Sequence, residues 1–256
     1  MTARRCAVPG ETGPVREIER AAAATWPATA VEHVDGWLLR HCDLLHRRRS
    51  NSALPPAVVD HPQRAVERVE EFYAARGART IIQVSPLEWH GELDRFLGAR
   101  GYRAVAPTAL MRAEVADVPP PAGRFEVRLD ERPDERWLAA CAAVGGRPEP
   151  SLDRIPQPVR FATATSGGAP VGVGVFAVTG RWCAVYGMAT HPDWRRRGVA
   201  RAVLGHGVRW ASRCDGAVRV DAALLQVEAG NAGARRLYER AGFVESHRYH
   251  YRVLDR

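Results

Sequence analysis

The sequence predicts an α/β fold with a mixed sheet, and the order of its elements is the main observation behind this prediction. An apolar, strand-like run over 182–190 ends in a basic turn that opens into a helical pattern. A second apolar run over 218–227 leads into another helical pattern over 232–243. Upstream, 159–165 and 171–178 alternate like two strands joined by a turn. Parallel strands linked through a helix, beside an antiparallel meander, make a mixed sheet.

A strand over 124–129 and a helix over 133–143 precede this meander. The first segment alternates between polar and apolar residues, and the second has helical spacing with a proline near its start, where proline is well tolerated. Residues 145–150 contain two glycines and two prolines and predict a loop. Gly187 lies inside the third strand of the meander, where a glycine favours a bulge.

The turn after this third strand has the features of a loop that binds a pyrophosphate. Arg195, Gly198 and Ala200 form the pattern Arg-x-x-Gly-x-Ala directly before the helix. Small residues let backbone N–H groups approach phosphate oxygens, and the positive end of the helix dipole points at them. Three more arginines add positive charge, Arg196, Arg197 and Arg201. Arginines before a helix are also common on solvated surfaces, so the neighbouring elements must support the interpretation.

Both helices of the second half have the spacing of surface helices that pack on a sheet. The first has a small and apolar stripe at Ala200, Val203, Leu204, Gly207, Val208 and Ala211. The second begins after Asn231, a suitable N-cap, and Gly242 is well placed to end it.

A weaker copy of this pattern occurs in the first half of the chain. Residues 65–76 form an amphipathic helical pattern, 80–84 a strand, and 93–102 parallels 234–243. Aligning Gly101 with Gly242 sets Leu97 opposite Tyr238, so the tyrosine has no counterpart.

Residues 36–40 and 46–55 are expected to pair as a hairpin, and no Gly-x-Gly/Ala step follows the arginines at 47–49. Three successive prolines in 118–123 force an extended path and mark the expected domain boundary.

The second half resembles the core of the GCN5-related N-acetyltransferase (GNAT) family. The resemblance lies in Arg-x-x-Gly-x-Ala at 195–200 and in the series Asn231, Leu237-Tyr238, Gly242-Phe243. It implies a GNAT fold, acetyl-CoA as acyl donor, and transfer of the acyl group to an amine. The weaker copy resembles tandem GNAT proteins. It implies a degenerate GNAT-like domain at 1–117, a linker at 118–123 and a catalytic domain at 124–256.

The resemblance also assigns roles to individual residues. The bulge at Gly187 would separate two parallel strands so that the pantetheine arm fits between them, with backbone N–H groups of Met188, Ala189 and Thr190 polarising the carbonyl. Asn231 would contact the cofactor arm, and Tyr238 would donate a proton to the departing sulfur. The expected pyrophosphate contacts are Arg195, Arg196, Arg197, Gly198, Val199, Ala200 and Arg201.

The residue that removes the amine proton is less clearly marked. Some GNAT enzymes have Glu where this chain has Gln226, and an amide cannot accept a proton at neutral pH. Glu228 is our candidate base, with Asp221, Tyr186 and ordered water as alternatives. The missing glutamate also leaves a second hypothesis, a regulator that binds acyl-CoA without catalysis.

Composition narrows the class of protein. The 256 residues are 46% hydrophobic, with no apolar run long enough to span a bilayer, and the N-terminus lacks the apolar segment of a secretory signal. We therefore expect a cytoplasmic protein. The five cysteines are scattered, and we interpret them as reduced thiols. His33, His41 and His46 have no second ligand cluster, so no metal site is expected.

The formal net charge is +8, and all 37 basic residues are arginine. This charge favours anionic ligands such as CoA, or acidic partner surfaces. The acceptor is a small molecule or a protein amine, and Tyr186, Tyr249 and Tyr251 are candidates for an aromatic groove. Binding to nucleic acid is a weaker hypothesis, because the arginines lie along helices beside carboxylates. The oligomeric state stays open.

Overall fold

The structure is a computed structural model that describes residues 13–121, 124–147, 149, 152–214, 216 and 218–255, apart from the side chains of 87–89. It confirms the mixed α/β fold. The strands are β1 (Ala30–Val34), β2 (Trp37–His41), β3 (Thr80–Val84), β4 (Arg103–Glu114), β5 (Glu126–Asp130), β6 (Val159–Ser166), β7 (Ala169–Thr179), β8 (Trp182–Thr190), β9 (Ala222–Glu228) and β10 (Val244–Leu254). The helices are α1 (Pro14–Ala24), α2 (Pro62–Ala74), α3 (Leu87–Ala99), α4 (Glu135–Ala143), α5 (Val199–Ala211) and α6 (Ala232–Glu239).

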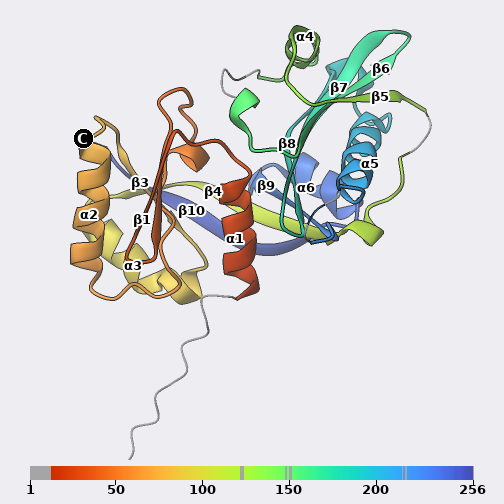
Figure 1. Cartoon of the computed structure of the whole chain (residues 1–256). Helices are drawn as coiled ribbons and strands as arrows, with labels where there is room; N and C mark the ends of the chain where they lie inside the picture. Colours follow the sequence, from red (N-terminus) through yellow and green to blue (C-terminus); the bar gives the residue numbers. More distant parts are fainter. Residues whose placement is uncertain are drawn as a thin grey trace, which may run out of the picture.

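One eight-stranded sheet runs through both halves of the chain, in the order β3-β10-β4-β9-β8-β7-β6-β5. In Figure 1 its β3 end, with α2 and α3, lies at the left, and its β5 end, with α4 and α5, lies at the right. The β8–β9 pair is parallel, and the other pairs of this sheet are antiparallel.

The order of the central strands shows an exchange between the two halves. β4, from the first half, lies between β9 and β10, whereas β10, from the second half, lies between β3 and β4. The hydrogen-bonded sheet therefore crosses the expected boundary at 118–123, and the division into two domains stays a prediction. Pro119 and Pro121 pack against α5 at Gly205, and Ala122 and Gly123 lie outside the described residues.

Helices cover both faces of the sheet. Side chains of α1 and α4 share one buried cluster with Leu224 and Tyr186, and α5 and α6 share another with Leu225 and Val185. Neighbouring residues of β8 and β9 thus point to opposite faces, as the strand period requires. The two faces are called here the α1/α4 face and the α5/α6 face. A third cluster joins α2 and α3 to β2 and β3.

Most expected elements are present, with shifted ends. The strand expected at 80–84 is confirmed, and so is the meander, whose first two strands are joined by Gly167 and Gly168, both at positive φ. The strand expected from 218 begins only at Ala222, because its parallel partner begins there, with Trp182 opposite Ala222. The helix expected from 133 begins at Glu135, after Asp134 accepts a hydrogen bond from the Trp137 amide.

The hairpin expected between 36–40 and 46–55 is wrong. β2 pairs instead with β1, through a two-residue turn in which Asp35 and Gly36 have φ of 48° and 80°. Positive φ at both positions matches the twist of the flanking strands, and Asp-Gly is a preferred sequence for such turns. The later segment contributes only an isolated bridge between Leu54 and Leu38 on the other edge of β2.

Candidate active site

The centre of the site is a gap between β8 and β9. The two strands pair in parallel from Trp182 and Ala222 up to Val185 and Leu225, and the ladder stops there although both strands continue. On the other edge of β8, the register with β7 shifts between Val173 and Val175, so the Gly187 region forms a bulge. Gly187 has φ of 57°, a conformation that favours glycine. The bulge expected at this glycine is confirmed.

The register also shows which backbone groups face the gap. His191 N donates to Val171 O, and Ala189 lies opposite Val173 two residues earlier. Because residues of an antiparallel pair alternate between bonded and non-bonded positions, the Ala189 N–H points toward β7. By the same alternation, the N–H groups of Met188 and Thr190 point toward β9, where the ladder has ended.

The N-terminus of α5 is open to an anion on the α5/α6 face. Gly198 is its N-cap with φ of 91°, no side chain caps the helix, and its first turn holds no acidic residue. The first amides, from Val199, Ala200 and Arg201, therefore lack a helical or side-chain acceptor. A Cβ on Gly198 would meet nothing within 4 Å, so space lies above this turn.

Arginines surround this helix end. Arg195, Arg196 and Arg197 are exposed, and Arg201 is exposed on the first turn. Within the described residues these four make no ion pair, and Arg197 lies with Cζ 5.2 Å from the ring centroid of Trp194. The free amides, the dipole of α5 and the guanidinium groups together suit a phosphate group.

Tyr238 lies on α6 and is 8% exposed. It belongs to the same buried cluster as Val227 of β9, and Met188 of β8 packs against that cluster. Burial raises the pKa of Tyr238 to about 12, so the hydroxyl stays protonated at neutral pH. Among the described residues its hydroxyl has no hydrogen-bond partner, which leaves it available to an external one.

Asn231 caps the N-terminus of α6, as expected, because its Oδ1 accepts from the Ala234 amide at 3.0 Å. Glu228 is the exposed last residue of β9. Alternation along β9 places Gln226 and Glu228 on the face that carries Leu224, the α1/α4 face.

The other two candidate bases are engaged elsewhere. The Tyr186 hydroxyl lies 2.6 Å from Thr25 Oγ1 and donates to Ala22 O, and burial raises its pKa. Asp221 accepts from Arg181 Nε at 2.7 Å, at the opposite end of β9 from the gap. The structure therefore brings Glu228, but not Asp221, to the gap.

A cavity of about 320 Å³ opens beside the bulge on the α1/α4 face. It is lined by Trp26, Arg47, Arg49, Trp137, Cys141, Gly145, Gly146, Arg147, Glu149, Leu152, Val175 and 186–189. Tyr186 thus lines it as expected, whereas Tyr249 and Tyr251 stack edge to face in the buried core, with ring centroids 5.4 Å apart.

The sequence did not indicate Trp26, Arg49 or Glu149 as site residues. Trp26 and Arg49 belong to the first half: Trp26 follows α1, which packs on β8, and Arg49 lies in the 3-10 helix after β2 and contacts Tyr186 of β8. A lone tryptophan and one arginine among three carry no local pattern that would have marked them.

The corresponding place in the first half is filled by side chains. There Ala53 forms a parallel bridge with Ile82 of β3, the counterpart of the β8–β9 pair. Pro56 O and the Ser85 amide are both bonded by the ring of His90. Under the alignment of Gly101 with Gly242, His90 takes the position of Asn231.

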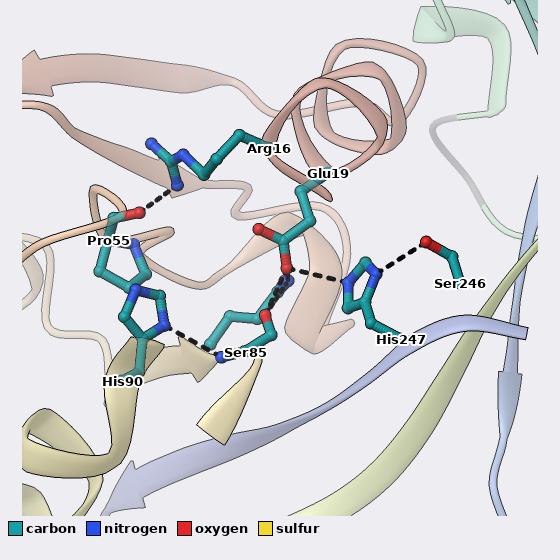
Figure 2. Close-up of polar contacts among 8 residues, drawn as sticks. Arg16, Glu19, Pro55, Ser85, His90, Ser246 and His247 are labelled. Atoms are coloured by element: carbon teal, nitrogen blue, oxygen red, sulfur yellow. Dashed lines mark hydrogen bonds and ion pairs between the residues drawn. The ribbon is translucent and has the colours of Figure 1, made fainter. Parts of the chain in front are cut away.

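A buried carboxylate completes this filling. Figure 2 shows Glu19 of α1 meeting Ser85 and His247. Glu19 Oε1 accepts from Gln83 Nε2 at 3.1 Å and lies 3.3 Å from His247 Nε2. Helix α2, which lies between Ala53 and β3 in the chain, begins with Pro62, and proline has no N–H to donate to an anion.

Neither a metal site nor a membrane helix is found in the described part of the chain. No group of three or more His, Cys, Asp or Glu residues there has the geometry of a metal centre. None of the described helices is both long and apolar enough to cross a bilayer. Cys42, Cys141 and Cys183 are buried free thiols, and Cys6 lies outside the described residues.

Known proteins share both this sequence pattern and this fold. Residues 12–252 match the family described as "Probable histone acetyltransferase Rv0428c C-terminal". An uncharacterized N-acetyltransferase of Bacillus subtilis, YobR, is 26% identical over 250 residues, which cover 93% of this chain and 98% of the relative.

Two solved structures have the same fold over most of their length. A GCN5-related N-acetyltransferase from Kribbella flavida superposes with a TM-score of 0.74 at 18% identity, covering 94% of this chain and 96% of the other. A tandem GNAT protein from the clavulanic acid biosynthesis pathway superposes with a TM-score of 0.59 at 10% identity, covering 93% and 87%. Because the family match spans nearly the whole chain, the protein belongs to the GCN5-related N-acetyltransferase family and is an N-acetyltransferase of that type.

Proposed function

We propose that the enzyme transfers the acetyl group of acetyl-CoA to a primary amine by direct attack in a ternary complex. The observation that carries the proposal is the gap between β8 and β9 directly before an uncapped, arginine-rich helix N-terminus. A long donor with an anionic middle and a thin arm fits this combination, because phosphates suit the α5 amides and the arm suits the gap.

The residues of the chain then have distinct tasks. Amides of Gly198, Val199, Ala200 and Arg201, with the side chains of Arg195, Arg196 and Arg197, hold the pyrophosphate, and Asn231 contacts the arm. The N–H groups of Met188 and Thr190 donate to the carbonyl oxygen of the acyl group. We assign Ala189 no such donation, because its N–H points toward β7.

Bound acetyl-CoA supplies a thioester, whose C–S bond breaks as a C–N bond to the acceptor forms. Tyr238 donates its hydroxyl proton to the departing sulfur, for which its raised pKa keeps it protonated. Glu228 accepts the proton that leaves the nitrogen, directly or through water, from its exposed place on the α1/α4 face. The acceptor enters through the cavity on this face and the donor from the α5/α6 face.

Only the second half binds acyl-CoA in this proposal. In the first half the corresponding gap is filled by His90 and the buried Glu19. Helix α2, the counterpart of α5, begins with Pro62. A pyrophosphate at the start of α2 would also find one amide fewer than at α5, because Pro62 has no N–H.

The test is release of free thiol from acetyl-CoA with a panel of primary amines, including a lysine-rich peptide. We expect release that depends on the amine, and a lower kcat at neutral pH for Glu228→Gln. Tight binding of acetyl-CoA without release for any amine would favour the alternative, a non-catalytic regulator. An unchanged kcat in Glu228→Gln would show that water, and not Glu228, accepts the proton from the amine.

A further inference from the structure

Arg49 presents an unpaired guanidinium group at the wall of the cavity beside the bulge. Its Cζ lies 4.7 Å from the ring centroid of Trp26 and 5.4 Å from that of Tyr186. Among the described residues, no carboxylate forms an ion pair with its side chain and no acceptor forms a hydrogen bond with it. A cation–π contact with these rings uses none of the N–H donors of the guanidinium, so the donors stay available to an anion.

The two rings under Arg49 are themselves held in place. Trp26 Nε1 donates to Ser50 Oγ at 2.8 Å, and the Tyr186 hydroxyl is bonded to Thr25. The rings meet edge to face with centroids 4.8 Å apart. Arg49 is therefore supported by a rigid platform, so little ordering is required when a ligand binds.

The charges that line the cavity do not balance. Among the described residues that line it, Arg47, Arg49 and Arg147 carry guanidinium groups and Glu149 carries a carboxylate. That carboxylate is already bonded by Arg47. A cation that enters the cavity meets a surplus of positive charge, whereas an acceptor that carries its own anion is attracted.

We propose that the acceptor amine carries an anionic group, a carboxylate or a phosphate, and that Arg49 binds this group. The inference rests on the proposed acetyl transfer and adds the chemical class of the acceptor. The cavity of about 320 Å³ admits a small molecule, with its nitrogen at Met188 of the bulge and its anion at Arg49. The aromatic walls favour an apolar body between these two ends.

The experiment compares matched acceptors in the thiol-release assay. L-phenylalanine is paired with its amide and with phenethylamine, and phosphoethanolamine is paired with ethanolamine. We expect kcat/KM to be roughly tenfold to a hundredfold higher for the anionic member, the span expected of a hydrogen bond to a charged group. The two pairs distinguish a carboxylate from a phosphate as the preferred anion.

Arg49→Gln tests the residue, and Arg48→Gln is the matched control. Arg48 belongs to the same short 3-10 helix, is exposed and does not line the cavity. Arg49→Gln should raise KM for anionic amines by roughly tenfold or more while leaving their uncharged partners unchanged. Arg48→Gln should behave like the wild type with every acceptor.

Two outcomes overturn the inference while acetyl transfer stands. One is a wild-type enzyme that prefers phenethylamine, ethanolamine or a lysine-rich peptide, and the other is an equal loss for both members of a pair in Arg49→Gln. If no amine releases thiol, the transferase proposal fails instead. Calorimetry of L-phenylalanine and phosphoethanolamine against their partners then decides the anion preference, since equal affinities refute it.

Discussion

Tyr238→Phe separates the catalytic role of a buried tyrosine from its structural role. Tyr238 is 8% exposed, and its hydroxyl has no hydrogen-bond partner among the described residues, so the fold gains no hydrogen bond from it. Removing a hydroxyl that has no partner in the protein should leave the free energy of unfolding unchanged or raise it by up to about 1 kcal/mol. Loss of the proton donor should lower kcat by roughly a hundredfold, or about 2.7 kcal/mol in activation free energy.

Tyr73→Phe is the matched control, with the opposite expectation. Tyr73 is fully buried, and its hydroxyl donates to Arg40 O at 2.9 Å. The variant should lose about 1 kcal/mol of stability, because the Arg40 carbonyl loses its partner, and should keep the wild-type kcat.

The assays are thiol release for kcat, urea unfolding for stability and calorimetry for acetyl-CoA affinity. Tyr238→Phe should bind acetyl-CoA as tightly as the wild type. The assignment of Tyr238 as proton donor is refuted if this variant keeps the wild-type kcat. It is also refuted if kcat falls only in proportion to a loss of folded protein.

Three further variants test the site and the fold around it. Gly198→Val should cost about 1–2 kcal/mol of stability and weaken acetyl-CoA binding. The control Gly101→Val, at a similar φ of 89°, should cost the same stability and leave acetyl-CoA binding intact. If the two variants bind acetyl-CoA equally tightly, the α5 turn is not part of the site. Gly207→Ala places a Cβ 2.3 Å from the ring of Phe176, so the free energy of unfolding should fall by about 1–3 kcal/mol. An unchanged free energy of unfolding would contradict the close packing of α5 on β7. Burial lowers the pKa of His90 below 6.5, so its contribution to stability is complete above pH 6.5 and falls as the pH drops below it. Below pH 6.5 the unfolding free energy of His90→Gln should therefore fall less steeply than that of the wild type. Parallel curves of unfolding free energy against pH would show that His90 does not cause this loss of stability.

Local signals account for what the sequence predicted well. The bulge at Gly187, the start of α5 directly after the Gly198 turn and the N-cap Asn231 each depend on the conformational preferences of one residue and its neighbours. The stripe of α5 follows from helical spacing alone. For the same reason the Asp35-Gly36 turn was a readable signal, and overlooking it produced the wrong hairpin.

Long-range packing accounts for what the sequence did not predict. Nothing in the residues of β4 or β10 specifies that either strand inserts into the other half of the sheet. The acceptor cavity depends on contacts such as Thr25 with Tyr186, which are 161 residues apart. Arg49 can be recognised as a site residue only in the structure, which places it beside the rings of Trp26 and Tyr186 without a counter-ion among the described residues.

The most direct test of the account is the stoichiometry of acetyl-CoA binding, measured by isothermal titration calorimetry on the full chain. We predict one molecule per chain, with binding weakened in Gly198→Val and retained in His90→Gln. Two molecules per chain would show that the first half is not closed by Glu19 and His90. No binding at all would contradict the proposal that α5 and the gap between β8 and β9 hold the acyl donor.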